Sequence, residues 1–230
     1  MKSVLISNRP KWCGKICHEI GKDENGKPIY EKTIEVRKER PSEVPFRCLI
    51  YATKPKKWYK SGPLLISDES LWLVNGKVKM CDGLELWADS AENYHCLNGK
   101  IIGEFICDRV EEFHEWQLSP QGKFQEAEQH DLDVFLRESC LTIKEVAEYR
   151  KNLPYYKPLY CWQISDLKIY DKPKELSEFY TIDESGSDCC VACVYHETPL
   201  EEMPCRTCTS ERKYLTRPPQ SWQYVEEVRK

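Results

Sequence analysis

Apolar and polar positions alternate over short stretches of the chain, which predicts a fold made mainly of strands. The apolar run SVLIS at residues 3–7 indicates a buried strand, and TIEVR at residues 33–37 alternates polar with aliphatic side chains as a half-buried strand does. Two short strand-like pieces are expected between residues 64 and 80, around an Asn75-Gly76 turn. The other expected strands cover residues 46–53, 99–110, 159–171 and 221–227.

Helical spacing is confined to a few segments. Apolar residues recur at helical intervals after Pro10, which predicts a first helix that Gly21 ends, followed by a polar loop with an Asn25-Gly26 turn. Thr142 and Glu145 form a capping-box pattern, which predicts a helix from there to about Lys151. Residues 54–63 and 111–130 are expected to be loops. The pattern therefore predicts an α+β fold in which two or three helices interrupt the strands.

Length and composition indicate a folded globule. The 230 residues include 40% hydrophobic and 31% charged residues, and no apolar run approaches the roughly 20 residues of a membrane helix. The first residues lack the long apolar segment and cleavage site of a signal peptide, so we expect a cytoplasmic protein without membrane association. No Gly-rich phosphate loop and no internal repeat is present.

Charge is distributed unevenly along the chain. Residues 1–60 contain 15 Lys or Arg against 7 Asp or Glu, whereas the remainder contains 19 against 31. A polyanionic partner should therefore meet the N-terminal part, unless its basic residues are scattered over a solvated face. Within it, Lys11 lies on the outer side of the first expected helix. Trp58 and Tyr59 stand among lysines and could stack on single-stranded nucleic acid, or lie in a solvated loop.

Thirteen cysteines is a high and odd number for this length. Most lie singly in apolar stretches, which suits reduced thiols, but five crowd between residues 189 and 208. Two Cys-x-x-Cys pairs in this cluster, separated by eleven residues, have the spacing of a structural zinc site of the zinc-ribbon kind. The predicted zinc ligands are Cys190, Cys193, Cys205 and Cys208, with Cys189 and His196 as alternatives, and four free thiols as the competing interpretation.

The stretch TIEVR also carries the candidate ligand-binding residues. On a strand, Thr33, Glu35 and Arg37 share one face, where the last two can form an ion pair. Arg37 could then donate to a phosphate or a base edge, Glu35 could accept from an exocyclic amine, and Lys32 at the strand entrance could reach a phosphate or act as a reactive amine. The alternative is an exposed ladder of charges with little energetic effect.

The pattern Lys32-x-x-Glu35-x-Arg37 resembles the hallmark of the ASCH family, Gly-x-Lys-x-x-Glu-x-Arg, with Tyr30 at the position of the glycine. The blocks SVLIS, PKWC, TIEVRK, GEFICDRV, YCWQISDLKIYDKPKELSEF and RPPQSWQYVEE resemble, in order, those of larger ASCH proteins often carried by bacteriophages and prophages. The resemblance implies one PUA-like mixed β-barrel over residues 1–230 with two or three flanking helices. Residues 54–98 and 181–213 would be insertions, the second zinc-ribbon-like, and residues 214–230 would return as the last strand.

The resemblance also implies a function. PUA-like domains use a pocket beside the first helix to bind RNA or a modified nucleobase, so a nucleic-acid or modified-nucleotide binding protein is expected. Some small ASCH proteins instead hydrolyse N4-acetylcytidine with a lysine, a threonine and a glutamate. Here the lysine corresponds to Lys32, Glu35 stands in place of the threonine, and Glu104 is a guess for the second acid.

Three functions therefore remain open at the level of the sequence. Binding is favoured, because the chain offers no complete catalytic triad, no metal site with an open position and no nucleophile with its base. An amidohydrolase or nuclease using Lys32 is the alternative. The phage-like setting adds a third: a protein of the bacterial or phage-infected cytoplasm that binds a host defence or regulatory protein. The oligomeric state is left open.

Overall fold

The structure is a computed structural model, and it describes most of the chain outside the cysteine-rich segment. The described residues are 1–54, 59–61, 64–66, 69–80, 94–114, 126–154, 156–182, 215 and 217–227. They form two compact units, each assembled from segments distant in the sequence. Unit 1 comprises Met1–Gly14, Phe46–Phe105 and Leu167–Lys230, and unit 2 comprises Lys15–Pro45 and Ile106–Asp166. The assignment of one domain over residues 1–230 with two insertions stays a prediction.

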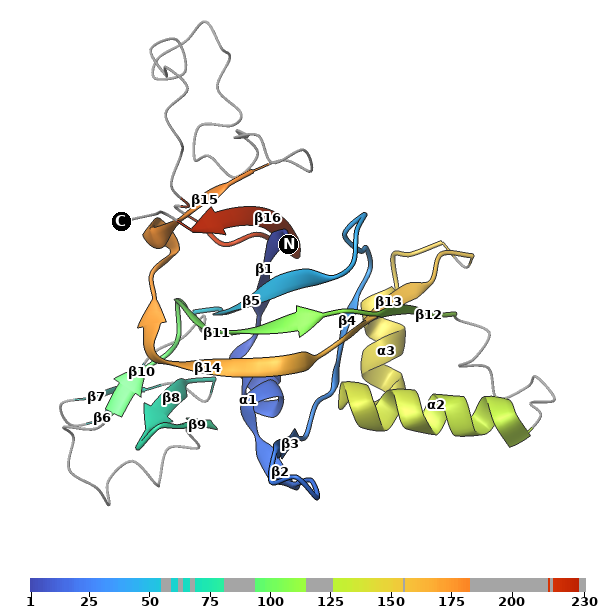
Figure 1. The fold of residues 1–230 in the computed structure, drawn as a ribbon, viewed down its shortest axis with the longest axis horizontal. Helices are drawn as coiled ribbons and strands as arrows, with labels where there is room; N and C mark the ends of the chain where they lie inside the picture. The colour runs from blue at the N-terminus through green and yellow to red at the C-terminus, as the bar shows by residue number, and fades with distance from the viewer. Residues whose placement is uncertain are drawn as a thin grey trace, which may run out of the picture. The chain divides into compact units, whose positions relative to one another are not determined.

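Unit 1 is organised around a six-stranded mixed sheet (Figure 1). The central strand β1 (Ser3–Asn8) runs parallel to β5 (Phe46–Ala52) and antiparallel to β16 (Trp222–Glu227), so the last strand pairs with the first. The sheet continues through β11 (Lys100–Cys107) to β14 (Ser165–Lys174) on one side and ends at β15 (Phe179–Thr181) on the other.

The described strands do not close the barrel expected from the sequence. β14 and β15 form the two edges of the six-stranded sheet. The strands that could have extended it are used elsewhere: β12 (Val110–Phe113), β13 (Leu159–Gln163) and β4 (Ile34–Arg37) pair with one another in a sheet of unit 2. An open mixed sheet is therefore the observed architecture of unit 1.

Smaller elements complete unit 1. The helix α1 (Pro10–Cys17) begins in it, and β8 (Leu71–Val74), β9 (Lys77–Met80) and β10 (Tyr94–Cys96) form a three-stranded sheet. Asn75 and Gly76, with φ of 50° and 75°, make the predicted turn between β8 and β9. The expected loop at residues 54–63 is wrong in part, because β6 (Tyr59–Ser61) pairs with β7 (Leu64–Ile66). A short 3-10 helix, η4 (Leu176–Glu178), precedes β15.

Unit 2 packs two helices against its three-stranded sheet. Helix α3 (Ile143–Arg150) begins at the predicted capping box, in which the Glu145 backbone N–H donates to Thr142 Oγ1 at 3.2 Å and the Thr142 N–H donates to the Glu145 carboxylate at 3.0 Å. The expected loop at residues 111–130 is wrong at both ends, because β12 extends to Phe113 and helix α2 (Glu126–Ser139) begins at Glu126. The apolar core of this unit consists of Ile34, Val36, Phe113, Leu132, Phe135, Val146, Leu159 and Cys161.

The second incorrect prediction in unit 2 concerns the first helix. It ends at Cys17 rather than at Gly21, and Glu19–Lys22 is instead strand β2, paired with β3 (Pro28–Tyr30). Ile20 fits the helical spacing but is 59% exposed. The helix therefore gains no stabilisation from burial of this side chain. The hairpin closes through Asp23, whose Oδ1 accepts from the backbone N–H of Asn25 and of Lys27.

None of the helices in the described part of the chain is long and apolar enough to cross a membrane.

Candidate functional site

The strand β4 and the residues that lead into it carry three buried charged side chains. Lys32, Glu35 and Arg37 have only 4%, 6% and 6% of their side-chain surface exposed. The alternative of an exposed charge ladder is therefore wrong. Burial of a charged side chain costs free energy unless an opposite charge or a hydrogen bond compensates it. Each of these three side chains therefore needs a partner inside the fold.

The three side chains form one ion-paired cluster. Arg37 Nη2 lies 2.9 Å from Glu35 Oε1, which is the pair expected from alternation, and Lys32 Nζ lies 3.2 Å from Glu35 Oε2. Lys32 Nζ also donates to the backbone oxygen of Ser139 at 3.2 Å. Within the cluster two cations share one carboxylate, so an anion or an electron-rich oxygen is the ligand that its charge favours.

Backbone hydrogen bonds connect the two residues that precede β4 to three other segments of the chain. The Lys32 N–H donates to the Lys15 oxygen at 3.3 Å, the Thr33 N–H donates to the Glu138 oxygen at 3.0 Å, and the Thr33 oxygen accepts from Ile164 N–H at 2.8 Å. In contrast, the Thr33 hydroxyl is buried and has no hydrogen-bond partner among the described residues. A buried hydroxyl without a partner costs about 1–3 kcal/mol, so it marks a position where a ligand could donate or accept.

Two aromatic residues of β13 lie on the same side of the sheet as Glu35 and Arg37. In the register of β13 with β4, Trp162 faces Glu35 and Tyr160 faces Arg37, and directly opposed side chains point to the same side of a sheet. Trp162 is fully buried and Tyr160 is half-buried. Sequence reasoning missed both residues. Alternation in LYCWQ puts them on one face, but only the register shows which strand they oppose.

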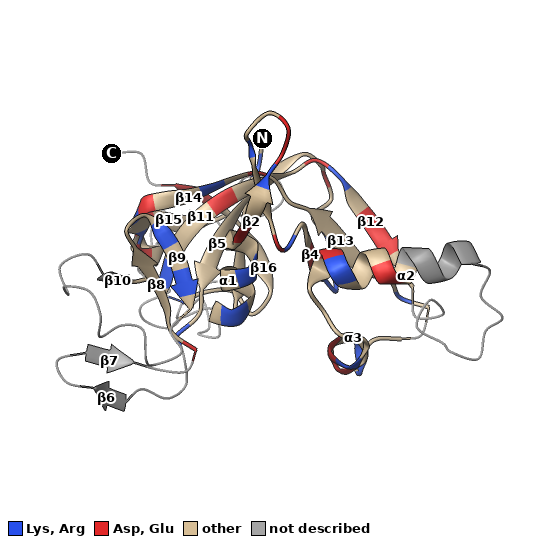
Figure 2. Cartoon of the chain, turned by 90° about the horizontal axis from the view of Figure 1, so that it is seen from below, with Lys and Arg blue, Asp and Glu red and all other residues tan. Residues whose placement is uncertain are grey.

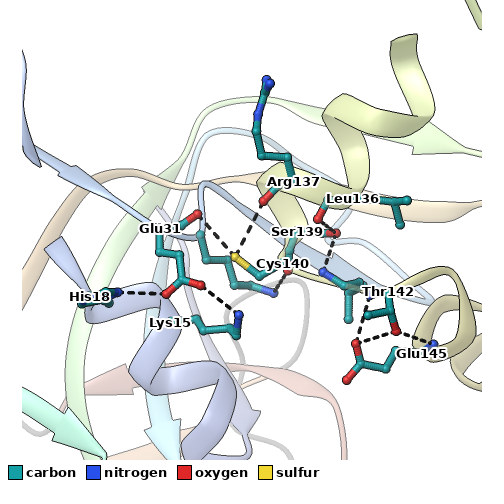
Figure 3. A network of polar contacts seen from close by, with 11 residues as sticks. Lys15, His18, Glu31, Leu136, Arg137, Ser139, Cys140, Thr142 and Glu145 are labelled. Atoms are coloured by element: carbon teal, nitrogen blue, oxygen red, sulfur yellow. Dashed lines mark hydrogen bonds and ion pairs between the residues drawn. The ribbon is translucent and has the colours of Figure 1, made fainter. Parts of the chain in front are cut away.

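A polar network surrounds Glu31, the residue that precedes Lys32 in the sequence (Figure 3). The Glu31 carboxylate lies 2.8 Å from Lys15 Nζ and 2.9 Å from His18 Nδ1. The hydrogen bond from Lys15 lowers the pKa of Glu31, and the same bond raises the pKa of Lys15. Cys140, with a φ of 56°, donates its thiol to the Glu31 backbone oxygen at 3.4 Å. Burial raises the pKa of this thiol despite the nearby Lys15, so it stays protonated and is no thiolate nucleophile.

Two other predicted site residues lie in unit 1. Lys11 is exposed on α1, with Nζ 4.5 Å from the ring centroid of Trp12. Glu104 lies on β11, where it accepts from Arg47 Nε at 2.6 Å and from the Tyr170 hydroxyl. Burial raises the pKa of Glu104, but these two hydrogen bonds outweigh it and lower the pKa below its usual value. Its role as a second catalytic acid stays a prediction.

The basic positions of residues 1–60 are divided between the two units and are partly paired. Lys11 belongs to unit 1, whereas Lys15, Lys27, Lys32 and Arg37 belong to unit 2 and each form an ion pair with a carboxylate. Lysines outside this segment also mark unit 1, as on β9 (Figure 2). Basic side chains are therefore confined neither to one unit nor to the N-terminal part of the chain.

The remaining predicted residues lie outside what the structure describes. Trp58 is not described, and Tyr59 is described only as part of strand β6. The described residues contain no cluster of three or more His, Cys, Asp or Glu that could hold a metal. The predicted zinc ligands and their alternatives all fall outside the described ranges: Cys189, Cys190, Cys193, His196, Cys205 and Cys208.

The chain is similar to solved structures of another protein and its variants. No family model and no curated protein matches the chain. Over its whole length it is similar to the ASCH protein of Zymomonas mobilis, with 16% identity, a TM-score of 0.41 and 89% of that chain covered. Two single-residue variants of that protein, one with a tyrosine changed to phenylalanine and one with a serine changed to alanine, match with 14% identity, TM-scores of 0.43 and 0.42, and 92% and 89% coverage. Such similarity assigns no role to any residue here, so the ASCH resemblance rests on the sequence motif.

Proposed function

We propose that the chain binds a nucleotide, either a modified nucleotide or a base within RNA, at the charged face of β4. The observation that carries this proposal is the pairing of β4 with β13, which sets Glu35 and Arg37 opposite Trp162 and Tyr160. Aromatic rings, a guanidinium and a carboxylate on one face are the groups with which proteins stack and hydrogen-bond a splayed base.

Each group of this face suits one part of such a ligand. Arg37 can donate to a carbonyl or phosphate oxygen, and Glu35 can accept from an exocyclic amine. Thr33 adds a buried hydroxyl with no partner among the described residues. Tyr160 is half-buried beside Arg37, so at this end of the face a ligand reaches the protein from solvent.

The test is binding of a short RNA and of a panel of modified nucleosides and nucleotides, measured by calorimetry at several salt concentrations. The decisive variant is Arg37→Lys, which keeps the charge but loses the planar donor fork. It should weaken binding at least about tenfold, because a hydrogen bond to a charged group is lost. The matched control is Arg109→Lys, which changes an exposed arginine in the same unit and should leave affinity unchanged.

Two outcomes would overturn the proposal. One is unchanged affinity in a folded Arg37→Lys protein. The other is RNA binding that does not respond to salt, since phosphate contacts must release counterions. If Arg37→Lys does not fold, Tyr160→Leu gives the same test at a half-buried position, because loss of the ring should weaken stacking.

Catalysis is the competing function at the same residues. The buried Lys32 Nζ is engaged by the Glu35 carboxylate at 3.2 Å and by the Ser139 backbone oxygen at 3.2 Å, and neither partner activates it as a nucleophile. We therefore propose binding without turnover. Release of acetate from N4-acetylcytidine that Lys32→Ala abolishes would show instead that the chain is an amidohydrolase.

A further inference from the structure

Unit 1 contains a cavity of about 590 Å³ that belongs to none of the predicted site residues. It lies where the end of β5 meets η4 and the residues that lead into β16. Its volume falls within the range of about 300–1,000 Å³ in which small-molecule sites occur. All the described residues that line it belong to unit 1, whereas the Lys32 cluster belongs to unit 2.

The apolar wall of this cavity is held by the core of unit 1. Tyr51 and Leu215 are members of the buried apolar cluster of the unit, and Leu176 packs against that cluster. Tyr51 is 3% exposed, and the Leu215 backbone N–H donates to the Phe179 oxygen at 2.8 Å. The half-buried Pro218 adds a further apolar surface. This wall is therefore preformed and can receive a flat ring.

Among the described residues, the polar side of the cavity carries two basic side chains and one acid. Lys54 and Arg217 are both exposed and line it, and Glu175 is the acid among the described lining residues. Lys100 Nζ lies 2.5 Å from the Glu175 carboxylate and compensates its charge. Lys54 and Arg217 therefore both lie where an anionic group that enters the cavity could contact them.

The Lys54 side chain lies against Gly99. Gly99 has a φ of +82°, and its N–H donates to the Ala52 oxygen at 2.6 Å, next to the end of β5. A Cβ at this position would lie 2.6 Å from Lys54 Cε and 3.1 Å from Lys54 Cγ. The Lys54 stem therefore lies directly over the glycine, and a larger residue would displace the lysine besides straining the backbone.

We propose that this cavity binds a planar aromatic ligand that carries an anionic group. The ring lies against Tyr51, Leu176 and Pro218, and the anion lies between Lys54 and Arg217. The hydroxyls of Thr53 and Ser177, which also line the cavity, supply hydrogen bonds to the polar edge of the ring. A nucleoside monophosphate and an aromatic carboxylate share this chemistry.

Calorimetry on the full chain tests the proposal with three probes: adenosine monophosphate, adenosine and naphthoate. At least one anionic probe should bind, and adenosine should bind at least about tenfold more weakly than its monophosphate if the nucleotide is the ligand class. Binding of naphthoate alone would support the shared chemistry and assign the site to aromatic acids. Failure of both anionic probes to bind at about millimolar concentration would overturn the proposal.

Variants distinguish this cavity from the Lys32 cluster. Lys54→Gln should weaken binding of the anionic probe at least about tenfold. Lys79→Gln, an exposed lysine on β9 of the same unit, should not change it. Gly99→Ala should weaken binding, because the added Cβ displaces Lys54. Arg37→Lys should have no effect on binding in this cavity. The two proposed binding sites can therefore be tested independently. Equal affinity of the wild type and Lys54→Gln for the anionic probe would overturn the proposed cavity site.

Discussion

The Arg37 guanidinium lies 2.9 Å from the Glu35 carboxylate, and only 6% of each side chain is exposed. Lys32 approaches the same carboxylate from the other oxygen, so Glu35 is the only acid within the three-residue cluster. An ion pair of this kind has little net effect when both partners are present, but removal of one partner leaves a buried charge uncompensated.

Replacement of Glu35 by Gln should destabilise the protein by about 3–5 kcal/mol, because Lys32 and Arg37 then lose their shared buried counter-charge. The measurement is the free energy of unfolding in urea. Glu111→Gln is the matched control, since Glu111 pairs with Arg109 at 3.2 Å but about two thirds of each side chain is exposed. The control should cost no more than about 1 kcal/mol. Equal effects of the two substitutions would show that the buried cluster has no special role.

The ion pair of Glu31 with Lys15 and His18 should make stability depend on pH in the acidic range. The pKa of Glu31 is below its ordinary value of 4.5, chiefly because Lys15 donates to it, so the folded state favours the charged carboxylate. This contribution is present above the ordinary pKa and is lost as the pH falls through the lower, folded-state pKa. The difference in unfolding free energy between wild type and Glu31→Gln should therefore be largest near neutral pH and shrink below about pH 4. A difference that does not vary with pH would contradict this account.

Loss of the Tyr170 hydroxyl should weaken the polar network of unit 1. This hydroxyl donates to Glu104 and accepts from Arg47 Nη2 at 3.3 Å. Tyr170→Phe should cost about 1–3 kcal/mol of stability, because part-buried charged groups lose a partner. The pKa of Glu104 should rise toward its usual value, which carboxyl NMR titration can follow. Tyr156→Phe changes an 81% exposed tyrosine and should leave both quantities nearly unchanged.

The cysteine spacing still predicts a structural zinc ion. We expect about one zinc per purified chain by elemental analysis, and markedly less in Cys190→Ser and Cys208→Ser. Cys140→Ser, whose thiol hydrogen-bonds to backbone oxygens, should keep the metal. A chelator should remove the zinc and leave the far-ultraviolet circular dichroism of the sheets largely intact. Zinc-free protein that also fails to bind added zinc would exclude the site.

Local signals in the sequence located much of the secondary structure. The capping box at Thr142 and the Asn75-Gly76 turn depend on neighbouring residues only, and both occur as predicted. Alternation at TIEVR likewise gave the strand and the Glu35–Arg37 pair. Elements that depend on distant contacts were missed. The apolar positions of α2 are few, and the helix becomes favourable because Phe135 stacks on Phe113 with ring centroids 3.8 Å apart.

The sequence by itself determined that β4 carries charges on one face and aliphatic side chains on the other, because alternation along a strand is a property of the backbone. Only the tertiary structure decided that the charged face is buried. Pairing with β13 sets Trp162 and Tyr160 against it, and the end of α2 brings the Ser139 oxygen to Lys32. Register and helix docking depend on contacts between residues more than a hundred positions apart, which no local pattern encodes. This burial separates the row of charges from the solvated surface.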